Sequence, residues 1–368
     1  MKKVGIMTFH SAHNYGAMLQ VYALQNIIKK LNNESYIINY RNSKIDSEYK
    51  VWNVKSKNPI NILKKTISSI SNYKINRERY NNFEAFMNKR FNLSKEYRTV
   101  KELNYNSPCY DVYITGSDQV WNPGIVGELS DAYTLNFGSK SIKRISYAAS
   151  MGNPEIKEIY INDYKNKISK IDKISVREND AKNSLSEIID KKIDVVLDPT
   201  LLLTQEEWKQ EIKDYKKEEE KYILAYVVKE DEEYRKIVNY LSEKTGLKVV
   251  HFEKDDNYEN ILKSAYTNGP LEFVNLINNA EYVVATSFHA TVFSIIFNKK
   301  FYVIPHEKTG SRVTNLLDTL EIENRVVYTL DEFKQMKYSK EIDYNKVNQK
   351  LDDEREKSIN WLKNAIES

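Results

Sequence analysis

Short apolar runs alternate with longer amphipathic stretches along the whole chain. We expect strands at the apolar runs, which cover residues 4–7, 35–40, 112–115, 145–149, 174–176, 195–197, 222–228, 248–252, 282–285 and 301–304. Apolar positions at helical spacing fill the intervals, for example over residues 17–31, 232–244, 271–279 and 289–297. Repeated strand–helix alternation predicts parallel sheets that are covered by helices on both faces.

The length of the chain and one break in its pattern favour two domains. A single hydrophobic core stops growing at about 250 to 300 residues, and this chain has 368. Proline and polar residues follow the strand expected at 195–197 and mark a boundary. We expect one doubly wound domain over residues 1–205, with a basic helical insertion at about 50–105, and a second over residues 206–340. An amphipathic helix within residues 341–368 is expected to cross back and pack on the first domain.

The composition excludes several classes of protein. The single cysteine, Cys109, cannot form an intramolecular disulfide or a cysteine-based metal site. No run approaches the ~20 apolar residues of a membrane-spanning helix. The net charge of +4 is small for a dedicated nucleic-acid binder. We therefore expect a cytoplasmic protein without a nucleic-acid partner.

Basic residues gather between Arg41 and Lys101, where fifteen Lys or Arg accompany five Asp or Glu. The simpler interpretation is a solvated helical face. The alternative is a surface that contacts an anionic membrane or a lipid-phosphate-linked substrate, since each basic residue near anionic lipid contributes about 1 kcal/mol. In the second case the protein is peripheral at the inner face of the membrane, and raised salt should release it.

Histidines follow the expected strands, where open parallel sheets bind their ligands. Four of the five do so: His10, His13, His289 and His306. His289 has the most informative position, because it opens the helix expected after strand 282–285 and Thr286 or Ser287 can cap that helix. The N–H groups and positive dipole of a helix start suit an anion, such as a phosphate. The alternative is a core or capping histidine.

Arg177 is the matching feature of the first half, at the end of strand 174–176. Its planar guanidinium can donate two parallel hydrogen bonds to a phosphate or carboxylate. The alternative is a surface salt bridge with Glu178 or Asp180. Three further side chains follow strand 301–304 and either clamp a small polyanion or are solvated: His306, Lys308 and Arg312.

A mixture of polar and aromatic side chains typical of sugar sites follows strand 112–115. Asp118, Gln119 and Trp121 supply a carboxylate, an amide and an indole. The alternative is that Trp121 belongs to the core and Asp118 caps a helix. The loop after the first strand adds further acceptor-side candidates, namely His10, Asn14 and Gly16. Glycine-rich dinucleotide and P-loop motifs are absent, as is His-Glu-x-x-His, so neither NAD, ATP nor a metal is predicted.

At these positions the chain resembles the polysaccharide pyruvyl transferases. The matching segments are residues 14–16 (NYG), 110–122 (YDVYITGSDQVWN), 146–152 (SYAASMG), 175–178 (SVRE), 198–200 (DPT), 272–273 (EF), 286–297 (TSFHATVFSIIF) and 312–325. They occur in order and are spread over most of the chain. Together they are specific, although no single segment is.

The resemblance implies a fold similar to the glycosyltransferase B-type architecture, with two Rossmann-like domains facing a cleft. It implies phosphoenolpyruvate as donor and co-substrate, no cofactor or metal, and an acceptor sugar of a cell-surface polysaccharide or its lipid-linked precursor. Arg177 and His289 look like the residues that hold and activate phosphoenolpyruvate. The donor-side helpers would be Thr286, Ser287, His306, Lys308 and Arg312, and the acceptor side would lie in the first domain.

Two positions depart from the family pattern. Many relatives have arginine where Ser287 stands, and many have aspartate where Ala17 stands. Two alternatives follow. One is a glycosyltransferase with a nucleotide-sugar donor, whose ribose would bind an acidic residue of the second domain: Asp255, Asp256 or Glu272. The other is a non-catalytic glycan-binding relative.

Overall fold

The computed structural model describes residues 1–51, 72–229, 231–305, 310–336, 338 and 341–368. The chain divides into two compact units. We call residues 1–202 with 357–368 the N-terminal unit, and residues 203–356 the C-terminal unit. The sequence predicted a boundary at 205–206, three residues from the observed division.

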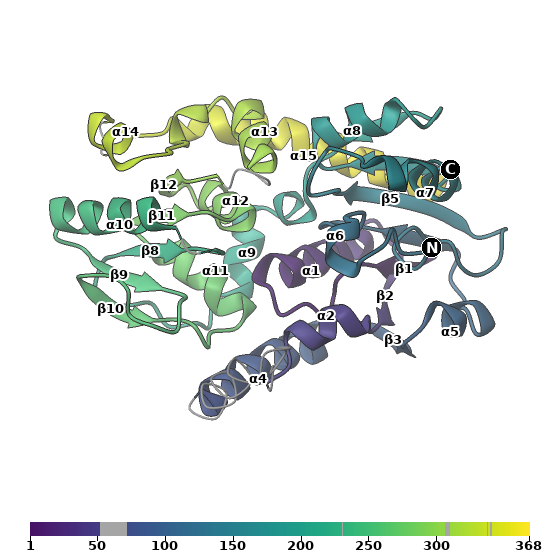
Figure 1. Cartoon of the computed structure of the whole chain (residues 1–368), viewed down its shortest axis with the longest axis horizontal. Helices are drawn as coiled ribbons and strands as arrows, with labels where there is room; N and C mark the ends of the chain where they lie inside the picture. The colour runs from purple at the N-terminus through teal and green to yellow at the C-terminus, as the bar shows by residue number, and fades with distance from the viewer. Residues whose placement is uncertain (52–71, 230, 306–309, 337, 339–340) are drawn as a thin grey trace. The chain divides into compact units, whose positions relative to one another are not determined.

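A parallel sheet of seven strands forms the centre of the N-terminal unit, in the order β3-β2-β1-β4-β5-β6-β7 (Figure 1). The strands are β1 Lys3–Met7, β2 Glu34–Tyr40, β3 Leu93–Tyr97, β4 Val112–Thr115, β5 Lys143–Ala149, β6 Lys173–Val176 and β7 Ile193–Val195. The helices are α1 Tyr15–Lys30, α2 Ser43–Glu48, α4 Tyr73–Arg90, α5 Val100–Tyr105, α6 Pro123–Val126, α7 Glu158–Ile168, α8 Asn179–Ser186 and the 3-10 helix η1 Pro199–Leu202. Every residue of β4 is buried, as expected of a central parallel strand with helices on both faces.

A parallel sheet of five strands forms the C-terminal unit, in the order β10-β9-β8-β11-β12. Its strands are β8 Tyr222–Tyr226, β9 Lys248–His251, β10 Ile261–Ser264, β11 Tyr282–Ala285 and β12 Lys300–Val303. Its helices are α9 Gln205–Glu211, α10 Glu232–Thr245, α11 Pro270–Asn279, α12 Phe288–Ile296, α13 Ser311–Thr319, the 3-10 helix η2 Glu323–Arg325 and α14 Leu330–Gln335. Helix α10 contacts α14, whereas α11 contacts α12, so the connecting helices form two groups. Right-handed crossovers place such groups on opposite faces of the sheet.

The last helix, α15 Tyr344–Glu367, begins in the C-terminal unit and ends in the N-terminal unit. Its second half is held there by side chains of the sheet region. Trp361 Nε1 donates to Asp194 Oδ2 of β7 at 2.8 Å, and the Leu197 backbone N–H donates to Ser358 Oγ at 3.0 Å. The end of the C-terminal helix, residues 357–368, thus belongs to the N-terminal unit.

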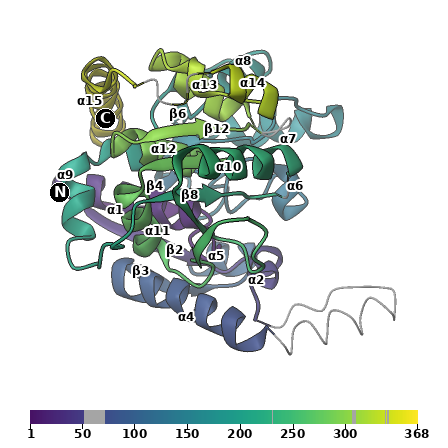
Figure 2. The same cartoon turned by 90° about the vertical axis from the view of Figure 1, so that its left-hand side faces the viewer.

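The sequence pattern did not predict two edge strands. Strand β3 pairs with β2 and lies with α4 at one edge of the N-terminal unit (Figure 2), and β10 pairs with β9. The predicted insertion at about 50–105 is therefore wrong for its described part, because β3 completes the sheet. Helix α4 also packs on α1 through the Tyr15 and Phe83 rings, 5.1 Å apart. Residues 52–71 lie outside the described part of the chain.

Candidate functional site

Each sheet has one topological switch point, where two neighbouring strands connect onward in opposite directions. The neighbours are β1 and β4 in the N-terminal unit, and β8 and β11 in the C-terminal unit. Ligands of open parallel sheets bind beyond the carboxyl ends of the strands at such points. The loops that follow these four strands are therefore the candidate sites, one in each unit.

The loop after β4 has an unusual backbone. Gly116 has φ +117°, and a Cβ there would lie 2.1 Å from the carbonyl oxygen of Tyr147, so the position requires glycine. Asp118 has φ +69°, a left-handed conformation that costs energy for a residue with a side chain. Such conformations persist only where the surrounding structure enforces them.

Buried side chains supply that enforcement through Ser117. Its backbone N–H donates to Gln20 Oε1 at 3.1 Å, and its carbonyl oxygen accepts from Thr8 Oγ1 at 3.1 Å. Its hydroxyl contacts the Ala148 carbonyl oxygen at 3.1 Å and Asp198 Oδ2 at 2.9 Å. The loop after β4 is thus fixed to β1, α1 and the start of η1.

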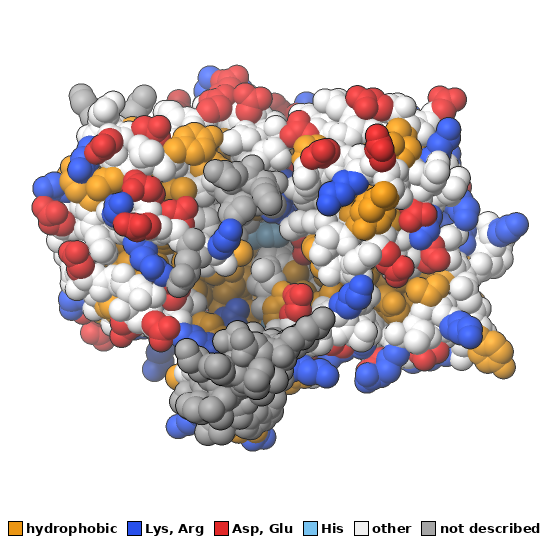
Figure 3. Space-filling view, in the orientation of Figure 1, with side chains coloured by type: hydrophobic (Ala, Val, Ile, Leu, Met, Phe, Trp, Pro, Cys, Tyr) orange, Lys and Arg blue, Asp and Glu red, His pale blue; other side chains and the backbone are white. Residues whose placement is uncertain are grey.

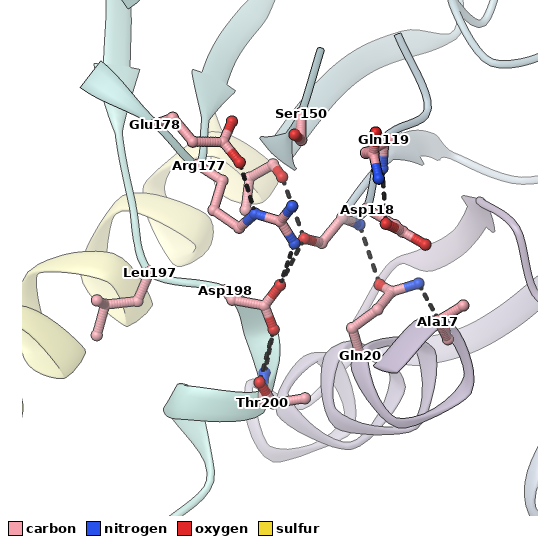
Figure 4. A network of polar contacts seen from close by, with 12 residues as sticks. Ala17, Gln20, Asp118, Gln119, Ser150, Arg177, Glu178, Leu197, Asp198 and Thr200 are labelled. Atoms are coloured by element: carbon pink, nitrogen blue, oxygen red, sulfur yellow. Dashed lines mark hydrogen bonds and ion pairs between the residues drawn. The ribbon is translucent and has the colours of Figure 1, made fainter. Parts of the chain in front are cut away.

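Arg177 lies at the centre of this network, between Glu178 and Asp198 (Figure 4). Its Nε donates to Glu178 Oε1 at 2.9 Å, and its Nη1 donates to Asp198 Oδ2 at 2.8 Å. The other oxygen of Asp198 accepts from the Thr200 backbone N–H and hydroxyl, at 3.0 and 2.6 Å. Burial alone would lower the pKa of Arg177, but the charges of Glu178 and Asp198 raise it above its ordinary value. Arg177 is therefore always charged.

The alternative interpretation of Arg177, a surface salt bridge, is corrected in two respects. Its side chain is 3% exposed, and its partners are Glu178 and Asp198 rather than Asp180. The local signal for Asp198 was its place in the Asp-Pro-Thr segment after the last strand. Nothing in the sequence indicated that it pairs with an arginine 21 residues earlier.

Two predicted acceptor-side residues are buried in the N-terminal unit instead. Trp121 is 0% exposed and its Nε1 donates to the Tyr133 carbonyl oxygen at 3.2 Å, so it is a core residue and cannot stack on a sugar. His10 is also 0% exposed and contacts Asn39 Oδ1 at 3.0 Å. Burial lowers the pKa of His10, which keeps the imidazole neutral at pH 7.

The other predicted acceptor-side residues stand at the carboxyl edge of the sheet. Asn14 caps α1, where its Oδ1 accepts from the Ala17 backbone N–H at 3.2 Å, and Gly16 is buried in the first turn of that helix. Asp118 and Gln119 are partly exposed. The Gln119 backbone N–H donates to Asp118 Oδ1 at 2.8 Å. Binding of the acceptor by these residues stays a prediction.

A polar cluster beside the β1 loop was not predicted. His13 Nε2 contacts Glu84 Oε1 of α4 at 3.0 Å, and Arg41 lies 3.7 Å from the same oxygen. Burial raises the pKa of Glu84, but His13 and Arg41 together lower it below its ordinary value. The cluster joins the β1 loop to α4, and only the tertiary fold brings His13 and Glu84, 71 residues apart, together.

In the C-terminal unit, His289 is the second residue of α12 and is 8% exposed. Ser287 is the N-cap residue, but its side chain makes no capping hydrogen bond. Thr286 Oγ1 instead accepts the Val228 backbone N–H at 3.0 Å, which ties the loop after β8 to the loop after β11. The capping role predicted for Thr286 or Ser287 is therefore wrong, while the helix start is confirmed. N–H groups of a first helical turn point outward and favour an anion.

The remaining donor-side candidates are divided between described and undescribed positions. Arg312 is the second residue of α13 and is partly exposed. His306 and Lys308 lie outside the described residues.

Among the residues that the structure describes, no group of His, Cys, Asp or Glu side chains could hold a metal ion. Within the same part of the chain, no helix is long and apolar enough to cross a membrane.

Comparisons with solved structures find chains of similar size at low sequence identity. UDP-GlcNAc 2-epimerase of Methanocaldococcus jannaschii is 15% identical, with 91% of each chain covered and a TM-score of 0.47. The Rickettsia bellii UDP-N-acetylglucosamine 2-epimerase is 11% identical, with 98% of this chain and 96% of that chain covered and a TM-score of 0.49. The E. coli heptosyltransferase WaaC is 9% identical, with coverages of 96% and 99% and a TM-score of 0.40.

Sequence comparison identifies the family directly. Among curated proteins, none matches this chain. A family model described as polysaccharide pyruvyl transferase matches residues 14–308, a range that includes the loops after β4, β8 and β11 and the residues Asp118, Arg177 and His289. The match covers most of the chain. The protein therefore belongs to the polysaccharide pyruvyl transferase family.

Proposed function

We propose that this protein transfers the pyruvyl group of phosphoenolpyruvate to a sugar of a cell-surface polysaccharide or its lipid-linked precursor. The product is a pyruvate ketal, and inorganic phosphate is released. The observation that carries the proposal is His289 in the first turn of α12, at the switch point of the C-terminal sheet. Membership of the family supports the glycan acceptor.

The donor carries a phosphate and a carboxylate, so its pocket must offer donors and positive charge. The start of α12 supplies backbone N–H groups and the positive end of a helix dipole. Helix α12 contacts α13, which carries Arg312 in its first turn. In the proposed reaction the phosphate binds at the start of α12, and His289 delivers a proton to the methylene carbon or stabilises the departing phosphate.

The acceptor sugar binds in the proposal at the switch point of the N-terminal sheet. The partly exposed side chains there, Asp118, Gln119 and Asn122, offer a carboxylate and two amides for sugar hydroxyls. Arg177 lies behind them, where its ion pairs hold the loop end of β6 and the start of η1. In the proposal Arg177 positions the loops of the acceptor site, because Glu178 and Asp198 together outweigh its single positive charge.

Ligand-dependent stability tests the proposed donor. Phosphoenolpyruvate should raise the melting temperature, because a ligand at 100 times its Kd stabilises the folded protein by about 2.7 kcal/mol. Pyruvate and inorganic phosphate, each carrying only part of the donor, should stabilise the protein less at the same concentration. Differential scanning fluorimetry measures both. Stabilisation by UDP- or ADP-sugars, without an effect of phosphoenolpyruvate, would contradict the proposal in favour of glycosyl transfer.

We propose further that the protein works in the cytoplasm, with peripheral contact at the inner face of the membrane. The exposed side chains of α4 include Lys74, Arg77 and Lys89. Elsewhere acidic and basic side chains alternate over the visible face (Figure 3). Binding to phosphatidylserine vesicles at low salt, and release near 0.5 M salt in a flotation assay, are the expected results, since salt screens such contacts. Binding that is unaffected by salt would contradict an electrostatic contact.

A further inference from the structure

Asp118 differs from the other carboxylates at the carboxyl edge of the N-terminal sheet. Asp198 and Glu178 are buried against Arg177, and Glu84 pairs with His13. Asp118 is partly exposed, and no ion pair joins it to a residue that the structure describes, although its charge acts on Arg177 and helps to raise the pKa of that guanidinium. One of its oxygens accepts the Gln119 backbone N–H, which fixes the carboxylate without neutralising its charge.

The location of Asp118 is the switch point itself. Its loop follows β4, and the Gly116 backbone N–H donates to the carbonyl oxygen of Met7 at the end of β1, at 3.2 Å. Tyr49, whose pKa is raised to about 12 by burial and then by the charges of Glu48 and Asp118, lies near the same carboxylate. A carboxylate beside an aromatic side chain at the sheet edge is an arrangement that suits a sugar hydroxyl.

The left-handed backbone at Asp118 shows that its position is enforced. The Asp118 carbonyl oxygen accepts from the Ser150 N–H at 3.0 Å, and Ser117 is held by Gln20, Thr8 and Asp198. Aspartate is one of the few non-glycine residues that adopt such a backbone, because its short side chain can bond locally, here to the Gln119 N–H, whereas glycine adopts it without any cost. Strained positions of this kind cluster at functional sites, where a particular side chain must be presented.

We propose that Asp118 is the general base that accepts the proton of the acceptor hydroxyl, an assignment that rests on the proposed function. As the hydroxyl oxygen bonds to C2 of the enolpyruvyl group, its O–H bond breaks and the proton moves to the carboxylate of Asp118. The methylene carbon gains a proton and becomes a methyl group. A second hydroxyl then bonds to C2, and phosphate leaves with the electron pair of its C–O bond. The two hydroxyls release two protons. One replaces the proton that the methylene carbon gained, and the other leaves with phosphate.

The decisive variant is Asp118→Asn, because asparagine has the same shape and tolerates the left-handed conformation. Loss of a general base lowers kcat/KM by about 10² to 10⁴. The assay is phosphate release from phosphoenolpyruvate with p-nitrophenyl glycosides of hexoses and N-acetylhexosamines as acceptors, on the full chain. The fall should appear in the reaction with the acceptor, while the KM for phosphoenolpyruvate stays that of the wild type.

Two controls separate a base from a structural residue. Asp163→Asn removes another partly exposed carboxylate of the same unit, in α7, and should leave the rate unchanged. Stabilisation of Asp118→Asn by phosphoenolpyruvate should equal that of the wild type. A variant rate within about threefold of wild type, far less than a general base contributes, overturns the assignment, as does weaker stabilisation of the variant by phosphoenolpyruvate. If the wild type itself releases no phosphate and is not stabilised by phosphoenolpyruvate, the proposed function fails and the role of Asp118 fails with it.

Discussion

Replacing Asp198 with alanine is expected to lower the free energy of unfolding of the N-terminal unit by about 3 to 5 kcal/mol, the cost of breaking a buried ion pair. The side chain of Asp198 is 0% exposed and accepts hydrogen bonds from Arg177, Ser117 and Thr200. Without it, the guanidinium of Arg177 stays buried with one carboxylate, Glu178. The loop after β4 also loses one of the hydrogen bonds that hold Ser117.

Urea unfolding followed by circular dichroism measures the loss. If the two units unfold in separate transitions, only the transition of the N-terminal unit should shift. The matched control is Glu96→Ala, which removes an ion pair of the same unit with Arg98 whose partners are 43% and 71% exposed. Exposed pairs contribute about 0 to 1 kcal/mol. Equal losses in the two variants would show that the Arg177–Asp198 pair is no more important than a surface contact.

A second comparison separates the effect of the two charges from the effect of the volume that the two side chains occupy. The double variant Arg177→Met with Asp198→Leu removes both charges and is expected to lose less stability than the sum of the single variants. Additive losses would mean that the two side chains stabilise the unit independently. That outcome would contradict the network seen around Arg177.

The central strands of both sheets could be predicted from the sequence because their residues are buried on both faces. Strands β4 and β11 read as continuous apolar runs, VYIT and YVVA, and their expected bounds are the observed ones. The edge strands gave no such signal. Strand β3 reads LSKEY and β10 reads ILKS, with charged residues at positions that an edge leaves exposed. Their pairing depends on a neighbour that is distant in sequence.

The sequence could predict those residues of the candidate site that directly follow a strand. His289, Arg177 and Asp118 each follow a strand, and the carboxyl-edge rule locates them without any tertiary information. The sequence left open whether Trp121 is a core residue or a sugar contact and did not predict that His10 is buried, because both outcomes depend on Tyr133 and Asn39 from other elements. Likewise, the missing cap at Ser287 depends on the actual side-chain conformation.

Replacing His289 with alanine is expected to lower kcat/KM for phosphoenolpyruvate by about 10² to 10⁴, the usual contribution of a general acid. The fold should persist, because alanine is the strongest helix former and Ala290 already follows in the same turn of α12. Phosphate release measures the rate, and circular dichroism with thermal melting verifies the fold. A rate unchanged in a folded variant would contradict a chemical role and favour the glycan-binding alternative.

The matched control is His251→Ala, which removes another buried histidine of the same unit. His251 ends β9, is 0% exposed and contacts Asp256 at 3.1 Å. Its strand lies away from the switch point between β8 and β11, so kcat/KM should not change beyond any loss of stability. A loss equal to that of the His289 variant would point to general damage to the C-terminal unit.

Comparison of the His289 and Asp118 variants tests whether the C-terminal unit binds the donor and the N-terminal unit binds the acceptor. His289→Ala should also weaken stabilisation by phosphoenolpyruvate, since the proposed phosphate site is the start of α12. Asp118→Asn should leave that stabilisation intact and slow only the reaction with the acceptor. Because the two residues act on different substrates, the KM for phosphoenolpyruvate should rise in the first variant alone. A rise in both variants would contradict the assignment of donor and acceptor to separate units.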